Sequence, residues 1–165
     1  MASRLLIDGY NLLFASDVFA SNAGPPTFER TRSTFLDVLA TVLPERQRGR
    51  TTIVFDAAQA PLGLPHAFQL AEMQIYFSRR PQHADDLLEE ILFTTKTPRE
   101  WLVVSSDHRV QRAARQRGAE YIDSEVWWQE LKRPVVVAEK TPPRESLNYN
   151  PFPPGYGEDL LPKQP

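Results

Sequence analysis

Residues 4–8 of the chain, Arg-Leu-Leu-Ile-Asp, are a short apolar run that ends at a carboxylate and is followed by Gly9. An apolar stretch of this length, stopped by a turn signal, is typical of a strand buried in a parallel sheet. The pattern returns at residues 51–56, Thr-Thr-Ile-Val-Phe-Asp, and at residues 101–107, where two serines precede the aspartate. The sequence therefore predicts three buried strands that each lead into an aspartate.

Helical and strand-like segments alternate along the rest of the chain. Further strands are predicted at residues 73–77 and 121–122, and residues 16–27 are predicted to be a loop because they are rich in Ser, Asn, Gly and Pro. Helices are predicted from about Phe28 to Pro44, from Asp85 through Thr95, around Val110 up to Gly118, and from an Asp123 cap through Leu131. Such alternation predicts an α/β fold with a mostly parallel central sheet flanked by helices on both faces.

Residues 134–165 depart from this alternation, since they hold eight of the chain's fifteen prolines. A segment with so few apolar residues does not build its own core. We therefore predict one domain over residues 1–133 and a proline-rich extended C-terminal tail over residues 134–165. Two alternatives stay open for the tail: it moves freely, as chain termini ordinarily do, or it docks in cis or onto a neighbouring subunit. The oligomeric state is left open.

The composition excludes several classes of protein. The chain has 165 residues, no cysteine and a formal net charge of −2. The absence of cysteine excludes a disulfide framework, a thiolate zinc site and a cysteine nucleophile. The weakly acidic balance excludes a basic nucleic-acid coat, so any nucleic-acid contact has to be local. No apolar stretch reaches the roughly 18 residues that span a membrane, and we expect no signal peptide and a cytoplasmic location.

The aspartates at the strand ends predict a common site. Ligands of open parallel sheets bind at the carboxyl ends of the strands. Asp8, Asp56 and Asp107 are therefore expected at one edge, and Asp85 adds a carboxylate at the start of a helix. Clustered like charges are costly unless a cation neutralises them. Because no His or Cys cluster accompanies these carboxylates, the expected cation is Mg²⁺ or Mn²⁺, and the matching reaction is phosphodiester hydrolysis.

Four of these segments together resemble the NYN domain family, and most closely its YacP-like branch. They are Ile7-Asp8-Gly9-Tyr10-Asn11, Val54-Phe55-Asp56-Ala57, Ala84-Asp85 and Ser105-Ser106-Asp107. The resemblance covers residues 4 to about 133 and implies a PIN-like Rossmannoid three-layer fold with divalent-metal-dependent endoribonuclease activity. It implies that Asp8, Asp85 and Asp107 are catalytic metal ligands. It also implies that Asn11 orients Asp8 or contacts substrate, whereas Asp56, a further candidate ligand, matches less tightly.

Other polar residues beside the aspartates are candidate RNA contacts: Ser105, Ser106, Arg79, Arg80, Arg109 and Arg112. Arginines can grip RNA phosphates through paired N–H groups, but the alternative for Arg109 and Arg112 is a solvated helix face. Asp107 has an alternative role as a helix N-cap, and capping and metal binding can coexist. Trp127 and Trp128 could stack bases, although helical spacing favours a core position for Trp127.

The alternatives to a nuclease find little support. The chain has no G-x-x-x-x-G-K-[ST] motif and no G-x-G-x-x-G motif after a strand, which argues against P-loop NTPases and dinucleotide enzymes. The expected function is an endoribonuclease that hydrolyses RNA phosphodiester bonds. The alternative is a catalytically silent PIN-like module that binds RNA or a protein, and the joint presence of three clustered carboxylates argues against it. A DNA-directed nuclease is a weaker alternative that no residue excludes.

Overall fold

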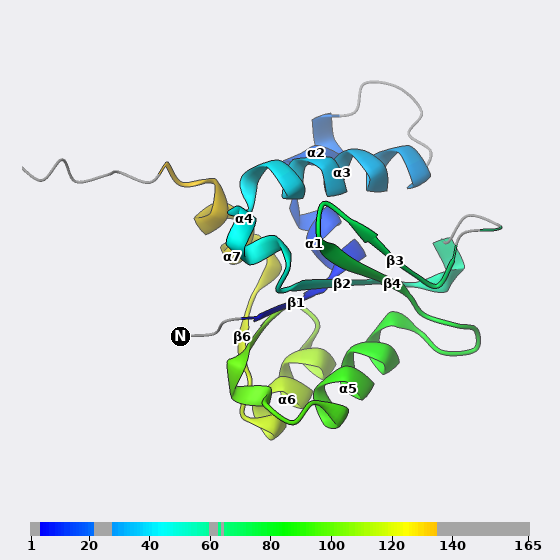
Figure 1. Cartoon of the computed structure of the whole chain (residues 1–165), viewed down its shortest axis with the longest axis vertical. Helices are drawn as coiled ribbons and strands as arrows, with labels where there is room; N and C mark the ends of the chain where they lie inside the picture. The colour runs from blue at the N-terminus through cyan, green and yellow to red at the C-terminus, as the bar shows by residue number, and fades with distance from the viewer. Residues whose placement is uncertain (1–3, 22–27, 60–62, 64, 135–165) are drawn as a thin grey trace, which may run out of the picture. The chain divides into compact units, whose positions relative to one another are not determined.

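The computed structural model describes residues 4–21, 28–59, 63 and 65–134, and within them six strands form one sheet (Figure 1). The order across the sheet is β3-β4-β2-β1-β5-β6, and every neighbouring pair is parallel except β3 and β4. This confirms the predicted α/β fold with a mostly parallel central sheet. The strands are β1 (Arg4–Asp8), β2 (Thr51–Phe55), β3 (Ala67–Leu70), β4 (Met73–Phe77), β5 (Trp101–Val104) and β6 (Glu120–Ile122).

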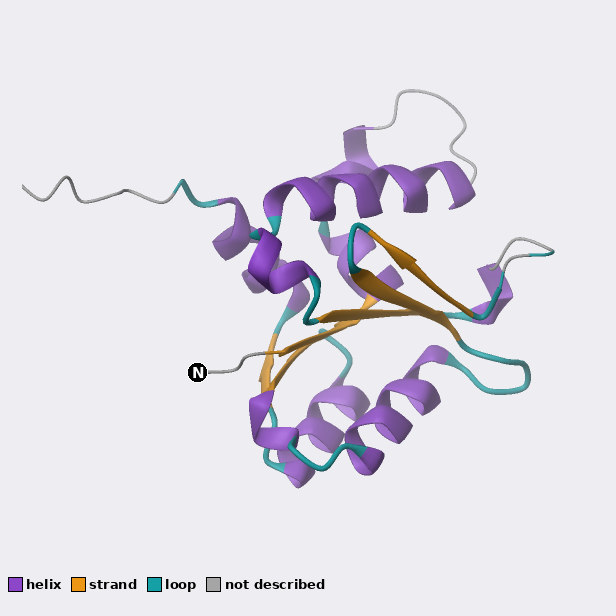
Figure 2. Cartoon of the chain, viewed as in Figure 1, coloured by secondary structure: helices purple, strands orange, loops and turns teal. Residues whose placement is uncertain are grey.

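Helices cover both faces of the sheet and make a three-layer structure (Figure 2). Helix α3 (Phe28–Val42) lies on one face with α1 (Gly9–Ala15), α2 (Asp17–Ser21), α4 (Glu45–Arg48) and α7 (Ser124–Lys132). Helices α5 (Ala84–Thr94) and α6 (His108–Arg117) lie on the other face. Short 3-10 turns occupy Ala57–Gln59 and Pro98–Glu100.

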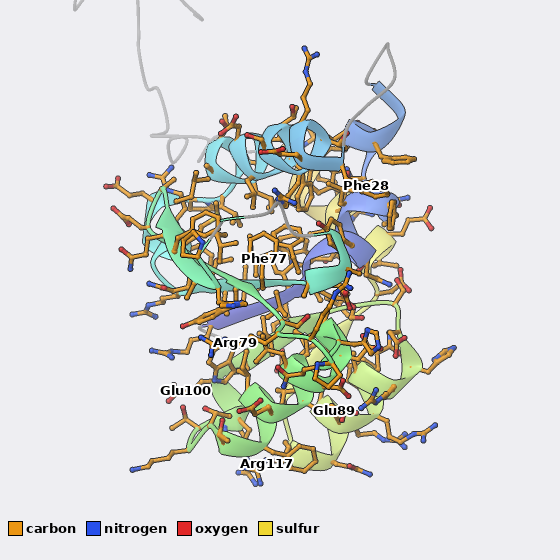
Figure 3. The ribbon with its side chains drawn as sticks, turned by 90° about the vertical axis from the view of Figure 1, so that its right-hand side faces the viewer. Phe28, Phe77, Arg79, Glu89, Glu100 and Arg117 are labelled. Carbon is orange, nitrogen blue, oxygen red and sulfur yellow. The ribbon has the colours of Figure 1, made fainter. Side chains whose placement is uncertain are left out.

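Alternating side chains of the central strands build two separate cores. Leu5 and Ile7 of β1 point to the core under α3, whereas Leu6 points to the core under α5 and α6. Successive residues of a strand face opposite sides of the sheet, so a strand covered on both faces needs apolar residues at every position. Figure 3 shows Phe77 on the α3 side of the sheet and Arg117 in the α5–α6 layer.

The structure adds elements that were not predicted. Residues 16–27 were predicted to be a loop, and this is wrong for Asp17–Ser21, which form α2; residues 22–27 lie outside the described residues. Helix α1 begins at Gly9, in a segment whose Asp-Gly step favours a turn. A Cβ on Gly9 would lie 2.5 Å from the Phe55 ring, so only glycine lets the start of α1 sit this close to β2. β3 pairs antiparallel with β4 and is only partly buried. Its sequence therefore lacks the continuous apolar run that predicts a buried strand.

All described helices and strands lie within one compact unit, Met1–Arg133. Beyond Pro134 the predicted tail lies outside the described residues, so its docking and the domain boundary at residue 133 stay predictions. None of the helices in the described part of the chain combines the length and the apolar character needed to cross a membrane.

Candidate active site

The order of the strands brings the predicted carboxylates to one edge of the sheet. β2, β1 and β5 are direct neighbours, and Asp56, Asp8 and Asp107 lie at or just after their carboxyl ends. Asp85 enters from the second position of α5, which packs on β1 and β2. Asp8, Asp85 and Asp107 lie close enough that the pKa of Asp8 and the pKa of Asp85 are raised by the negative charges of their neighbours. The structure therefore gathers these three carboxylates into one electrostatic cluster.

Asp8 is the deepest member of this cluster, with only 7% of its surface exposed. The pKa of Asp8 is raised to about 7, mainly by burial, and the negative charges of Asp85 and Asp107 contribute to this rise. The Oγ–H of Ser105 donates to Oδ2 of Asp8 over 3.0 Å and lowers the pKa, as does the backbone N–H of Asn11. Asp8 is thus a carboxylate whose charged form is poorly solvated, and no salt bridge to it forms within the described residues.

Asp85 and Asp107 lie nearer to solvent than Asp8. The pKa of Asp85 is raised, mainly by burial and next by Asp107, and Arg109 offsets this only in part. Asp107 caps α6, the alternative role that the sequence left open, because its Oδ1 accepts from the backbone N–H groups of Arg109 at 2.7 Å and Val110 at 3.2 Å. Within the described residues its Oδ2 has no hydrogen-bond partner. One oxygen of Asp107 is therefore available for a ligand while the other holds the helix.

A network of short polar side chains fixes the turn after β5. The buried Ser105 hydroxyl donates to Asp8 and accepts from the backbone N–H of Asp107 over 3.1 Å, so it links the Asp8 carboxylate to the backbone of Asp107. The side-chain oxygen of Asn11 accepts from the N–H of Ser106 at 2.8 Å and from the hydroxyl of Ser124 at 2.7 Å. Asn11 thus ties α1 to the β5 turn and to α7, and Ser124 is a member of this network that the sequence did not reveal.

Asp56 points its carboxylate at backbone and histidine rather than at the cluster. Its Oδ1 accepts from the N–H of Ala58 at 2.8 Å, and its Oδ2 lies 3.1 Å from the N–H of Ala84 and 3.2 Å from Nδ1 of His83. Burial raises its pKa, but these donors outweigh burial and the net shift is downward. Both oxygens are occupied, and the contacts hold the start of α5, which carries Asp85. Its role as a metal ligand stays a prediction.

The contacts of Asp56 lead to a prediction about stability. Asp56→Ala is expected to lower the free energy of unfolding by about 1–3 kcal/mol, because it removes the acceptor of the part-buried N–H of Ala84 and of the exposed N–H of Ala58. Urea denaturation with and without the substitution measures this difference. The exposed Asp37 on α3 provides the matched control, and Asp37→Ala should change stability by less than about 0.5 kcal/mol. Equal effects of the two substitutions would contradict the structural role of Asp56.

The arginines predicted to contact RNA have different surroundings. Arg109 holds Glu89 through two hydrogen bonds of 2.8 and 2.9 Å and also bonds Asp86 at 2.7 Å, so it joins α6 to α5. Figure 3 labels Glu89 in the layer of these helices. Arg79 and Arg80 are exposed, and Arg80 lines a cavity beside Asp56. Arg112 is exposed on α6.

The two tryptophans of α7 both belong to the core. Trp127 is 7% exposed and Trp128 is 3% exposed. The indole N–H of Trp128 donates to Asp17 over 2.8 Å, which ties α7 to α2. The core position predicted for Trp127 is confirmed, and in this arrangement neither ring is available to stack a base.

The oxygen ligands of the cluster are chemically suited to a hard cation. Within the described residues, no three His, Asp or Glu side chains converge closely enough to hold a metal ion together. Mg²⁺, however, is usually held by one or two carboxylates and completes its shell with water and phosphate oxygens. Asp8 and Asp85 both have a raised pKa, and a bound cation would relieve the unfavourable burial of their charge. The residues present therefore fit a two-carboxylate site.

Comparisons with known proteins identify similar solved structures. Two solved structures of Rae1 (YacP) from Bacillus subtilis are similar to the chain. The first shares 25% sequence identity with this chain at a TM-score of 0.55, and the matched region covers 78% of this chain and 72% of the Rae1 chain. The second is a variant of Rae1 in which leucine replaces one tryptophan. It shares 23% sequence identity at a TM-score of 0.55, and the matched region covers 77% of this chain and 73% of the variant chain. No curated protein matches the chain significantly.

The comparison with protein families is more specific. Residues 5–149 match the YacP-like NYN domain, which confirms the resemblance seen in the four sequence motifs. The matched region runs past residue 133, where the domain was predicted to end. The likeness to Rae1 (YacP) shows that the α/β fold is of the PIN-like type. The chain therefore belongs to the YacP-like NYN family, a family of PIN-like nuclease domains.

Proposed function

We propose that the chain is a divalent-metal-dependent endoribonuclease that hydrolyses RNA phosphodiester bonds at the Asp8, Asp85 and Asp107 cluster. The observation that carries the proposal is the buried Asp8, whose pKa is raised to about 7 beside two further carboxylates at the carboxyl edge of the sheet. Ionised Asp8 in this arrangement costs stability, whereas a cluster of carboxylates is what a cation-assisted phosphodiesterase requires.

Each residue of the cluster has a distinct part in this proposal. Asp8 and Asp85 would hold Mg²⁺ or Mn²⁺, which when bound lowers the pKa of an attacking water and neutralises charge at the scissile phosphate. Ser105 keeps Asp8 in its orientation through the 3.0 Å hydrogen bond. Asp107 offers its unbonded Oδ2 to orient water or the cation's water shell. Asn11 and Ser106 hold the turn that carries these groups.

The substrate and location follow from the same proposal. The family of nuclease domains fits an RNA substrate, and Arg79 and Arg80, which are exposed close to α5, remain candidate phosphate contacts. A cytoplasmic location is proposed with it.

The second candidate function is a catalytically silent module that binds RNA or protein. The observation in its favour is that no three metal-ligating side chains converge within the described residues.

A cleavage assay separates the two functions. The full chain is incubated with end-labelled single-stranded RNA while Mg²⁺ or Mn²⁺ is titrated from zero, and EDTA is added in a parallel series. The proposal expects internal cuts that appear with the cation and disappear with EDTA. A DNA strand of the same sequence shows whether cleavage is specific for RNA. Intact RNA at every cation concentration, from a folded protein that still binds RNA, would favour the silent module.

A further inference from the structure

Helix α6 carries basic residues of two kinds. Arg109 and Arg117 face α5 and are bound there: Arg109 to Glu89 and Asp86, and Arg117 to the backbone oxygens of Leu92 and Thr95 at 3.0 and 3.2 Å. The Arg117 guanidinium also lies 5.7 Å from the Phe93 ring centre. These two arginines join α5 and α6 and already have partners there.

The other basic residues of α6 point away from α5. His108, Arg112 and Arg115 are spaced four and three residues apart, which places them on one side of the helix. Together with Gln111 and Tyr121 they line a cavity of about 240 Å³, which we call the α6 cleft. All three basic side chains are exposed, and none has a hydrogen bond, ion pair or ring contact to another residue in the described part of the chain. The α6 cleft is therefore a local positive surface on a chain whose net charge is −2.

The α6 cleft adjoins the carboxylate cluster. The side-chain amide of Gln111 donates to the backbone oxygen of Ser105 over 2.7 Å, and Ser105 in turn donates to Asp8. His108 directly follows Asp107 in the chain. β6, which carries Tyr121, is the outer strand next to β5. A chain molecule whose phosphate lies at the carboxylates can therefore continue along α6 into this cleft.

We propose that the α6 cleft binds an unpaired RNA segment that flanks the scissile phosphate. Arg112 and Arg115 pair with backbone phosphates, and the exposed ring of Tyr121, 43% of whose surface is accessible, stacks on a base. Stacking on a side chain requires a base that is splayed out of a helix, which single-stranded RNA offers and a duplex does not. The inference rests on the proposed function and adds to it the class of RNA and the surface that binds it.

The inference is tested by RNA binding measured apart from cleavage. The full chain carrying Asp85→Asn, in EDTA, is titrated into a fluorescein-labelled single strand of about 12 nucleotides, within the range of single-strand site sizes, and anisotropy gives Kd. Introducing Arg112→Ala and Arg115→Ala together into this protein is expected to weaken RNA binding by about tenfold or more, because each substitution removes a charge-assisted contact. The slope of log K against log salt should fall by about 1.4, which corresponds to two phosphate contacts on a single strand. Tyr121→Ala is expected to weaken binding by about fivefold or more, with the salt slope unchanged.

A matched pair of arginines controls for the loss of charge. Arg46 and Arg50 are exposed near the start of β2, at the opposite edge of the sheet from the carboxylates. Arg46→Ala with Arg50→Ala should leave Kd within about twofold, because these residues lie outside the proposed path of the RNA. Equal losses in both double variants, absence of RNA binding, or equal binding of a duplex would each overturn the inference. RNA binding that depends on the α6 cleft supports the inference even if the parent chain cleaves no RNA. Failure of the inference is therefore distinguishable from failure of the proposed function.

Discussion

Asp8→Asn is expected to lower the rate of cation-dependent RNA cleavage by about a thousandfold or more. The substitution removes the charge that holds the cation but keeps the shape of the side chain, and the new amide oxygen can still accept from Ser105. Cation-assisted stabilisation of a phosphoryl transition state contributes several kcal/mol, and each step of about 1.4 kcal/mol corresponds to about tenfold in rate. Asp85→Asn is expected to cause a loss of similar size for the same reason.

The measurement is a single-turnover cleavage rate at saturating Mn²⁺, with circular dichroism to show that each variant is folded. Asp37→Asn on α3 makes the same chemical change at an exposed site remote from the cluster, and its rate should match that of the parent. Full activity in both Asp8→Asn and Asp85→Asn would refute the assignment of the site, whatever the behaviour of the control.

The strands that position the site were predictable because they are buried on both faces. β1, β2 and β5 are nearly continuous apolar runs, and such runs stand out against polar surroundings. The confirmed prediction of helix α6 rests on two local signals, the Asp107 cap and Gly118, whose φ of 75° suits glycine. The short helices α1 and α2 are harder to predict, and α1 has neither a capping side chain nor a charged residue at either end.

The gathering of the carboxylates could be predicted, but their partners could not. That strand ends meet at one edge follows from the parallel sheet alone, and in the strand order β2-β1-β5 the strands that lead to Asp56, Asp8 and Asp107 are neighbours. The partners of these groups come from distant parts of the chain. The bond between Asn11 and Ser124 spans 113 residues, and the Arg109 pair with Glu89 joins two helices whose contact no local pattern encodes.

The same substitution that removes activity is expected to stabilise the cation-free protein. In the folded chain the pKa of Asp8 is about 7, whereas its usual value is 3.8. The folded state therefore holds the proton more tightly than the unfolded state, and stability falls as pH rises from about 4 to about 7. Each pKa unit corresponds to about 1.4 kcal/mol, so ionised Asp8 costs the fold on the order of 4 kcal/mol above about pH 7. Asparagine carries no such cost.

The free energy of unfolding of parent and Asp8→Asn, measured in EDTA by urea denaturation from about pH 4 to about pH 8, tests this expectation. The two proteins should be about equally stable near pH 4, and the variant should be more stable by a few kcal/mol near pH 8. Mg²⁺ at the higher pH should then stabilise the parent and leave the variant nearly unchanged, because binding to the folded state stabilises it by mass action. A difference between the proteins that does not depend on pH would show that Asp8 is not a buried charge. Equal Mg²⁺ effects would show that the cation, if it binds, does not bind at Asp8.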